Sequence, residues 1–250
     1  MLTRPSFINH LDFELLKAKF ITDESLQEAI DKIQNNYPVQ YLIGDVEFMD
    51  MKILVNPSVL IPRFETELLV QKAISYIDKF NLGNKIVDLC TGSGCIALYL
   101  KKHYPCSKVQ AYDISDDALI VAKNNSKLNN LHIEFCKEDI LNYDKYEKDI
   151  DVLISNPPYV KLNEEVSENT KYEPQIALYA GEDDIVFYKK ILINTKPFMA
   201  KKFIIAFEIG ATQANDICIF AKELYPNAII KVEKDFNNYD RFIFITQISE

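Results

Sequence analysis

The chain has 250 residues, of which 48% are hydrophobic and 26% are charged, and its formal net charge is −9. This composition is that of an ordinary globular protein, and the length allows one large α/β domain with a smaller domain attached. The acidic excess argues against direct binding to nucleic acid, and no apolar run approaches the roughly 18 residues that span a bilayer, so we expect a cytoplasmic protein without membrane contacts.

The N-terminal part of the chain predicts short amphipathic helices. Apolar residues recur at intervals of three and four within 12–20 and 22–36, and Thr22 or Asp23 is suited to cap the second helix. Alternation between residues 46 and 55 then predicts a β-hairpin. We therefore divide the chain into a helical subdomain (1–45), a hairpin linker (46–60) and a large domain (61–250).

Apolar runs alternate with helical patterns from residue 65 onward. Strands are expected at 85–89, 108–112, 132–136, 151–155, 203–208, 229–234 and 241–246, and helices at 65–80, 95–103, 116–129, 184–195 and 212–224. This alternation predicts an α/β fold with a Rossmann-like, mostly parallel sheet that is covered on both faces. The connection between the last two strands is too short for a parallel crossover, so these strands should pair antiparallel at or near an edge.

The five cysteines are an odd number without a C-x-x-C pair, and the chain has only three histidines. Neither a disulfide framework nor a metal site is therefore expected. We interpret the cysteines as small buried hydrophobic residues.

The first strand of the large domain ends in a motif that is suited to a ligand. Asp88 is followed by a turn with Gly92 and Gly94, and a helix begins at Cys95. Glycine lets the backbone approach a ligand closely, and the N–H groups at the helix start form a polar cradle. An acid here would repel phosphate and favour a cation. A tight turn without a ligand is the alternative.

Acidic residues also end the next two predicted strands. Asp113 comes about 20 residues after the glycine turn, where a carboxylate can accept both hydroxyls of a ribose, and Asp139 could meet an adenine amino group. Because parallel strands end at the same sheet edge, the shared position predicts a binding site there.

The fourth strand ends in Asn156, Pro157, Pro158 and Tyr159. The asparagine carries a carboxamide acceptor, the prolines contribute carbonyl oxygens and stiffen the turn, and the tyrosine supplies a flat ring. This combination suits a planar N–H2 group. A strand that simply ends at prolines is the alternative.

These motifs together resemble class I S-adenosylmethionine-dependent methyltransferases that act on planar nitrogen. Further segments are similar, in the same order, to those of the HemK family, the protein-glutamine N5-methyltransferases of peptide chain release factors: PVQYLIG, NPSVLIPRFETE, YEPQIALYAGEDD, EIGATQ and KDFNNYDRF. The similarity extends from about residue 38 to the end of the chain.

The resemblance implies a role for each motif. The methionine part of S-adenosylmethionine would be surrounded by Cys90, Thr91, Gly92, Ser93 and Gly94. Asp113 would hold the ribose, Asp139 and Ile140 would flank the adenine, and Asn156 would also lie near the donor. The glutamine of a release-factor Gly-Gly-Gln tripeptide would be bound by Asn156, Pro157, Pro158 and Tyr159, with acceptance of its N–H bonds by Asn156 and Pro157 as the catalytic contribution. The segment 62–67 would line the same cleft.

The same resemblance implies a monomer whose residues 1–45 dock the release factor and whose product is S-adenosylhomocysteine. The chain departs from the family pattern at four places. Phe64 stands where proline is usual, Cys90 replaces a common glycine, Asn237 and Asn238 replace a glycine-containing turn, and the N-terminal helical part is short.

Two other functions share part of this pattern. A DNA adenine or rRNA guanine N-methyltransferase would also act on a planar N–H2 group, the exocyclic amine of the base, but the acidic net charge of the chain argues against this function. A nucleotide-binding oxidoreductase is disfavoured because the glycine fingerprint is incomplete.

Overall fold

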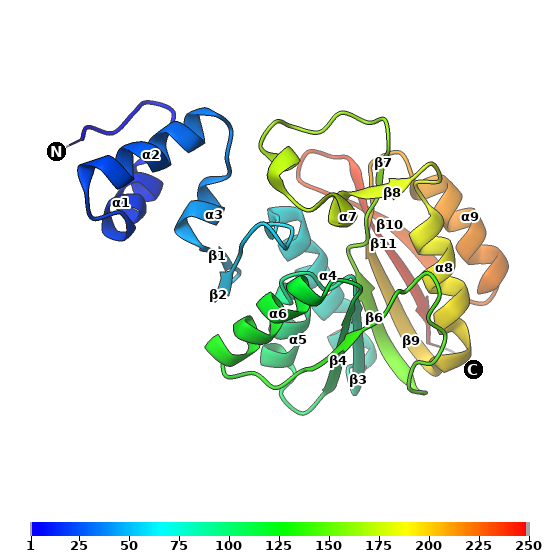
Figure 1. Ribbon diagram of the computed structural model, residues 1–250. Coiled ribbons are helices and arrows are strands. Elements are labelled where there is room, and N and C mark those ends of the chain that lie inside the picture. The colour runs from blue at the N-terminus through cyan, green and yellow to red at the C-terminus, as the bar shows by residue number, and fades with distance from the viewer. Residues whose placement is uncertain (1, 249–250) are drawn as a thin grey trace.

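The computed structural model describes residues 2–248. The chain begins with helices α1 (His10–Lys19), α2 (Asp23–Gln34) and α3 (Val39–Ile43), followed by the antiparallel hairpin β1 (Asp45–Phe48) and β2 (Met51–Leu54) (Figure 1). The Ser25 N–H donates to Thr22 Oγ1 at 3.1 Å, so Thr22 is the N-cap of α2. The short helix α3 was not predicted, because five residues do not establish a periodicity.

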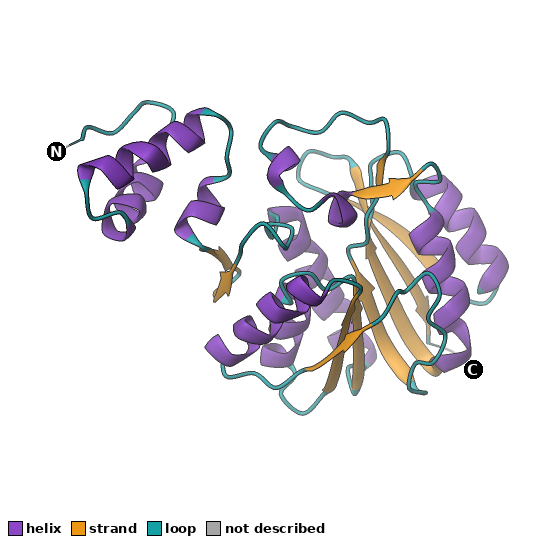
Figure 2. Ribbon diagram, viewed as in Figure 1, coloured by secondary structure: helices purple, strands orange, loops and turns teal. Residues whose placement is uncertain are grey.

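A seven-stranded sheet forms the body of the molecule, in the order β10-β11-β9-β6-β3-β4-β5 (Figure 2). Its strands are β3 (Lys85–Leu89), β4 (Lys108–Asp113), β5 (Glu134–Lys137), β6 (Ile150–Ser155), β9 (Met199–Glu208), β10 (Ile229–Lys234) and β11 (Asp240–Gln247). All neighbours pair in parallel except β11, which is antiparallel to both β9 and β10. The mostly parallel sheet and its antiparallel edge are therefore confirmed.

Helices cover both faces of this sheet. One face carries α4 (Phe64–Phe80), α5 (Cys95–His103) and α6 (Asp116–Leu128), and the other carries α8 (Val186–Thr195) and α9 (Ala214–Leu224) (Figure 1). Successive strand residues therefore enter different cores: Ile86 packs with the first group of helices and Val87 with the second. Burial on both faces explains why the strands are continuous apolar runs.

The segment between β6 and α8 contains small elements that were not predicted. They are β7 (Val160–Lys161), α7 (Gln175–Leu178), β8 (Tyr179–Gly181) and the 3-10 turn Thr170–Tyr172, and a further 3-10 turn, Lys196–Phe198, follows α8. Each is too short to show a period of its own. Residues 162–174, here called the strap, run beside the carboxyl edge of the sheet toward the N-terminal helices (Figure 1).

Tyr172 of the strap joins these two parts of the molecule. Its hydroxyl donates to Asn35 O at 3.0 Å, and its ring packs edge-on against Tyr37. The expectation that all five cysteines are buried holds fully for Cys95 alone: Cys90, Cys136 and Cys218 are partly exposed, and Cys106 is exposed in a polar turn. Within residues 2–248, no helix combines the length and apolar character needed to cross a membrane.

Candidate functional site

The loop after β3 depends on three residues with positive φ: Cys90 (59°), Gly92 (54°) and Gly94 (82°). A side chain at Gly92 would meet nothing within 4 Å, whereas one at Gly94 would lie 3.1 Å from Ala122 Cβ on α6. Gly94 therefore lets α6 pack closely, and Gly92 leaves the loop open. The left-handed conformation is unfavourable for a residue with a side chain such as Cys90. This gives a physical reason why glycine is common at this position in the HemK family pattern.

Asp113 at the end of β4 is bound to this loop. The Gly92 N–H donates to Asp113 Oδ2 at 2.8 Å, and the Ser115 N–H donates to Oδ1 at 2.9 Å. Burial raises the pKa of the Asp113 carboxyl, and the backbone donors oppose this rise. Each carboxylate oxygen retains a lone pair, so the side chain can still accept hydroxyl groups from the cavity that it lines.

Asp88 lies beneath the loop and does not line the cavity, so its carboxyl does not face a ligand there. Its side chain is fully buried and its Oδ2 accepts the Thr91 hydroxyl at 2.6 Å. Its Oδ1 finds no hydrogen-bond partner among residues 2–248. Burial raises the pKa of Asp88 to about 7 despite the Thr91 bond. The carboxyl therefore supports the loop from below.

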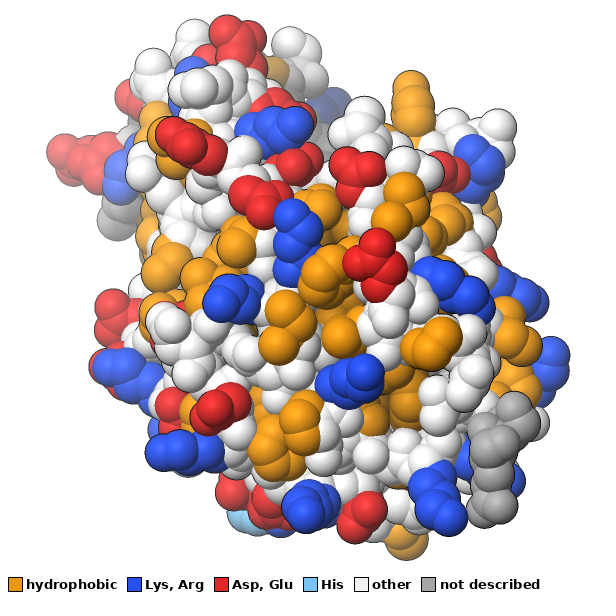
Figure 3. All heavy atoms as spheres, turned by 90° about the vertical axis from the view of Figure 1, so that its right-hand side faces the viewer, with side chains coloured by type: hydrophobic (Ala, Val, Ile, Leu, Met, Phe, Trp, Pro, Cys, Tyr) orange, Lys and Arg blue, Asp and Glu red, His pale blue; other side chains and the backbone are white. Residues whose placement is uncertain are grey.

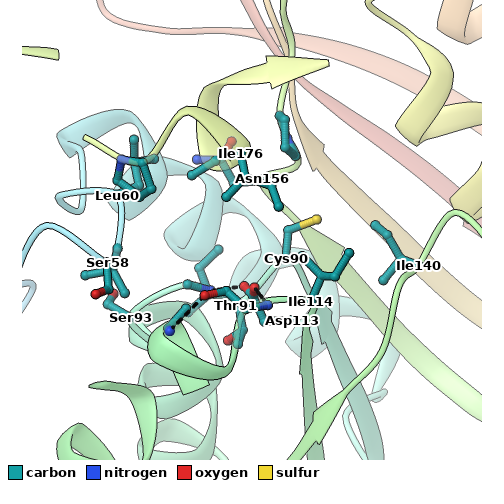
Figure 4. A pocket seen from close by; sticks show the side chains of 18 of the residues that line it. Ser58, Leu60, Cys90, Thr91, Ser93, Asp113, Ile114, Ile140, Asn156 and Ile176 are labelled. Atoms are coloured by element: carbon teal, nitrogen blue, oxygen red, sulfur yellow. Dashed lines mark hydrogen bonds between the residues drawn. The ribbon is translucent and has the colours of Figure 1, made fainter. Parts of the chain in front are cut away.

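A cavity of about 240 Å³ opens above the loop, at the carboxyl edge of the sheet. Cys90, Ile114 and Ile140 lie on one side of it, Leu60 lies opposite, and Asn156 lies above (Figure 4). Its charged lining consists of Asp113, Glu138 and Asp139, and the described lining residues include no Lys, Arg or His. The cavity is therefore apolar with an acidic margin, which suits a flat, positively charged ligand and disfavours a pyrophosphate.

The Asp139 carboxylate is turned toward the residues that follow it in the chain. The Leu141 N–H donates to Oδ1 at 3.0 Å and Asn142 Nδ2 donates to Oδ2 at 2.7 Å. These bonds hold the turn that brings the side chain of Ile140 to the cavity wall. Asp139 and Ile140 thus both line the cavity.

A second cavity, also of about 240 Å³, adjoins the first. The two share Leu60, Asn156 and Ala177, while Tyr159 and Glu208 belong to the second alone. Asn156 therefore stands where the two cavities meet. A group bound in one cavity can reach a group bound in the other at this side chain.

Asn156 is held from the side of α4. Its Nδ2 donates to Thr66 Oγ1 at 3.2 Å, and the Thr66 hydroxyl donates to Glu208 Oε2 at 2.8 Å. Its Oδ1 accepts no hydrogen bond from the rest of the described chain. An acceptor oxygen is thus available at the junction of the cavities.

Gln213 fixes the backbone of the turn after Asn156. Its Nε2 donates to Tyr159 O at 2.9 Å and to Asp184 O at 3.0 Å, and its Oε1 accepts the Gly210 N–H at 2.8 Å. The side chain is buried, so breaking these bonds would leave polar groups without partners. Gln213 therefore stabilises the turn that the two prolines stiffen.

The predicted site residues do not all reach a cavity. Gly94 and Pro157 line neither one, Pro158 lines the first, and Tyr159 lines the second. The roles of Glu208 and Gln213 were missed, although both lie in the segment EIGATQ, because a single polar residue in a motif does not reveal its partner. Thr66 lies in the segment that was expected to line the cleft.

The strap is anchored by Glu173, whose side chain is almost fully buried. Its Oε2 accepts the Ile61 N–H at 3.0 Å, and Oε1 pairs with Arg63. We expect Glu173→Ala to lower the free energy of unfolding by about 2 to 3 kcal/mol, because it leaves a buried N–H and a cation without their partner. Urea denaturation measures the loss.

Glu168→Ala is the matched control for this prediction. Glu168 belongs to the same strap but pairs with Lys171 in solvent, and exposed pairs contribute about 0.5 kcal/mol or less. Equal losses for the two variants would contradict the anchoring role of Glu173.

Comparisons with known proteins show which folds and families the chain is similar to. Residues 64–174 match the family model of the methyltransferase small domain. Among solved structures, the chain is similar to the hMettl16 catalytic domain in complex with an RNA hairpin, with a TM-score of 0.62 and 16% identity over 100% of this chain and 96% of that one. A methyltransferase from Pyrococcus furiosus has a TM-score of 0.58 at 17% identity, covering 80% of this chain and 90% of that one. These likenesses support the fold alone.

Curated relatives extend the similarity to sequence. A release factor glutamine methyltransferase from Lactococcus lactis is 34% identical over 95% of this chain and 89% of its own. A protein of the same name from Thermodesulfovibrio yellowstonii is 38% identical over 88% of this chain and 80% of its own. Similarity of this extent establishes the family: the chain belongs to the release factor glutamine methyltransferases.

Proposed function

We propose that the protein transfers a methyl group from S-adenosylmethionine to the side-chain amide nitrogen, N5, of the glutamine in the Gly-Gly-Gln tripeptide of peptide chain release factors. The observation that carries this proposal is the position of Asn156, which presents a carboxamide oxygen where an acid-lined cavity meets a second cavity. The family of the chain supports the same substrate.

The chemistry of the first cavity fits the donor. Asp113 would accept the ribose hydroxyls, Ile140 would pack on the adenine, and the residues 90–93 would surround the methionine part. The acidic lining would stabilise a sulfonium cation. When bound, S-adenosylmethionine supplies an electrophilic methyl group and is left as S-adenosylhomocysteine. Gly94 would contribute only through the shape of the loop.

Asn156 addresses the main difficulty of the reaction. An amide nitrogen is a poor nucleophile, because its lone pair is delocalised into the carbonyl. If Asn156 Oδ1 accepts one of its N–H bonds, and the carbonyl oxygen of Pro157, a residue that itself lines neither cavity, accepts the other, the nitrogen is oriented and its growing positive charge is stabilised. Orientation of reacting groups can supply on the order of 7 to 11 kcal/mol. The proton then leaves to water, with no strong base required beforehand.

Tyr159 and the strap would enclose the target glutamine in the second cavity. In this proposal, residues 1–45 dock the release factor, residues 46–60 link them to the methyltransferase domain 61–250, and the enzyme acts as a cytoplasmic monomer. The release factor is the partner, and nucleic acid is not bound directly. On the face that carries α8 and α9, Lys and Arg are interspersed with Asp and Glu (Figure 3). This face therefore has no continuous basic surface of the kind that binds nucleic acid.

The proposal is tested by incubating the protein with methyl-labelled donor and a release factor, beside a release factor whose tripeptide glutamine is replaced by alanine. We expect label in the first substrate and background in the second. Equal labelling of both would overturn the assignment. Label in DNA or rRNA, with none in protein, would instead support the nucleic-acid alternative.

A further inference from the structure

Glu208 is a buried carboxyl that the mechanism above does not use. It ends β9, is 1% exposed and lines the second cavity. Its Oε2 accepts the hydroxyl of Thr66, which is 3% exposed, and Thr66 Oγ1 lies 3.2 Å from Asn156 Nδ2. Three side chains from β9, α4 and the β6 end thus form one hydrogen-bonded line toward the substrate.

The direction of these bonds follows from the single hydrogen of the Thr66 hydroxyl. An ionised carboxylate only accepts, so Thr66 must donate to Glu208 and must accept from its other neighbour. The group that Asn156 turns toward Thr66 is therefore its N–H2. Its Oδ1 must then point the other way, toward the cavities.

We propose that Glu208 and Thr66 act as a positioning relay that holds the Asn156 carboxamide with its oxygen toward the substrate nitrogen, an inference that rests on the proposed function. When Glu208 is protonated, it can donate to Thr66 Oγ1, and Thr66 can then donate to Asn156. The carboxamide then turns its N–H2 group into the cavity. Two N–H2 groups would face each other, and the substrate would lose its acceptor.

The surroundings of Glu208 bring this ionisation near neutral pH. Burial raises the pKa of Glu208 to about 7, with Glu65 acting in the same direction and the Thr66 bond and Arg241 opposing it. The titratable and charged groups that face it are Glu65 on α4, Cys95 on α5, Tyr159 after β6, Tyr188 on α8 and Arg241 on β11. A modest change of pH therefore changes the state of the relay.

The first test removes the hydroxyl and then restores it. We expect Thr66→Val to lower kcat by about tenfold or more, with the Kd for S-adenosylmethionine within about threefold of wild type, and Thr66→Ser to recover most of the loss. Thr195→Val is the matched control, because Thr195 is equally buried but its hydroxyl donates to Ile191 O within α8. A Thr66→Val enzyme with near-normal kcat would overturn the relay.

The second test follows the carboxyl itself and serves also if Thr66→Val does not fold. At saturating donor, wild-type kcat should rise about tenfold from pH 6 to pH 8, as Glu208 loses its proton. Glu208→Gln has no group to titrate there, so its profile should lack that rise. If the two profiles superimpose, the relay is wrong.

Stability gives a readout that does not depend on activity. A carboxyl whose pKa is raised by folding binds its proton more tightly in the folded state than in the unfolded state. The free energy of unfolding therefore falls as the pH rises from 4.5, the ordinary pKa of a glutamate, to about 7, the pKa of Glu208 in the folded protein. The urea midpoint of wild type should decrease over this window relative to that of Glu208→Gln. An unchanging difference would contradict titration of Glu208.

The outcomes separate the two proposals. If wild type does not methylate the release factor, the proposed function fails before the relay is reached. If wild type is active and the Thr66 and Glu208 variants behave as wild type, the relay alone fails.

Discussion

Replacing Asn156 by alanine is expected to lower kcat by about 100- to 1000-fold while leaving the Kd for S-adenosylmethionine within a few-fold of wild type. The reason is that Asn156 stands at the junction of the two cavities and presents an acceptor to the nitrogen that must be oriented. Removing one group that stabilises charge in a transition state has an effect of this size. Single-turnover kinetics with saturating donor, beside calorimetry of donor binding, separates the two quantities.

Asn215→Ala provides the control for this result. Asn215 lies in the first turn of α9, is exposed, bonds Asp216 and lines neither cavity. Its loss should leave kcat unchanged. Near-normal turnover of Asn156→Ala would refute the mechanism, and a parallel loss of donor affinity would assign the residue to donor binding instead.

Asp113→Asn is expected to have the opposite signature, with the Kd for S-adenosylmethionine raised about 100-fold and kcat at saturating donor changed little. Two backbone N–H groups meet the two carboxylate oxygens, and an asparagine can satisfy only one of them. The variant also loses the negative charge that would hold the ribose hydroxyls. Hydrogen bonds to charged groups contribute about 1.5 to 3 kcal/mol each, which corresponds to this loss. Titration calorimetry measures it.

Asp117→Asn makes the same change of charge on the exposed first turn of α6, outside both cavities. It should bind the donor like wild type. If both variants weakened binding alike, the effect would come from net charge and the specific role of Asp113 would be contradicted.

The sequence predicted the large domain well because its strands are buried on both faces. Apolar runs such as 85–89 and 151–155 can only be satisfied in the centre of a covered sheet, and they form β3 and most of β6. The antiparallel pairing of β10 and β11 followed from the length of one connection. The family was predicted from the order of its motifs, and the relatives confirm it.

The polar contacts between distant segments could not be predicted in the same way. Thr66 and Glu208 are 142 residues apart, and nothing local to either residue indicates the other. Asp88 illustrates the converse: its place beside the loop was evident, but its complete burial depends on how α5 and the loop close over it. The strap was missed because its 3-10 turn, Thr170–Tyr172, has only three residues and its main anchor, Glu173, reaches back to Ile61 and Arg63.

The proposed function places the side-chain amide nitrogen of a glutamine at Asn156. The most direct measurement is tandem mass spectrometry of a release factor after reaction with the wild-type protein and S-adenosylmethionine. We expect a single added methyl group on the amide nitrogen of the Gly-Gly-Gln glutamine, formed about 100- to 1000-fold more slowly when Asn156→Ala is used. A methyl group on any other residue, or on nucleic acid with the release factor unmodified, would contradict it.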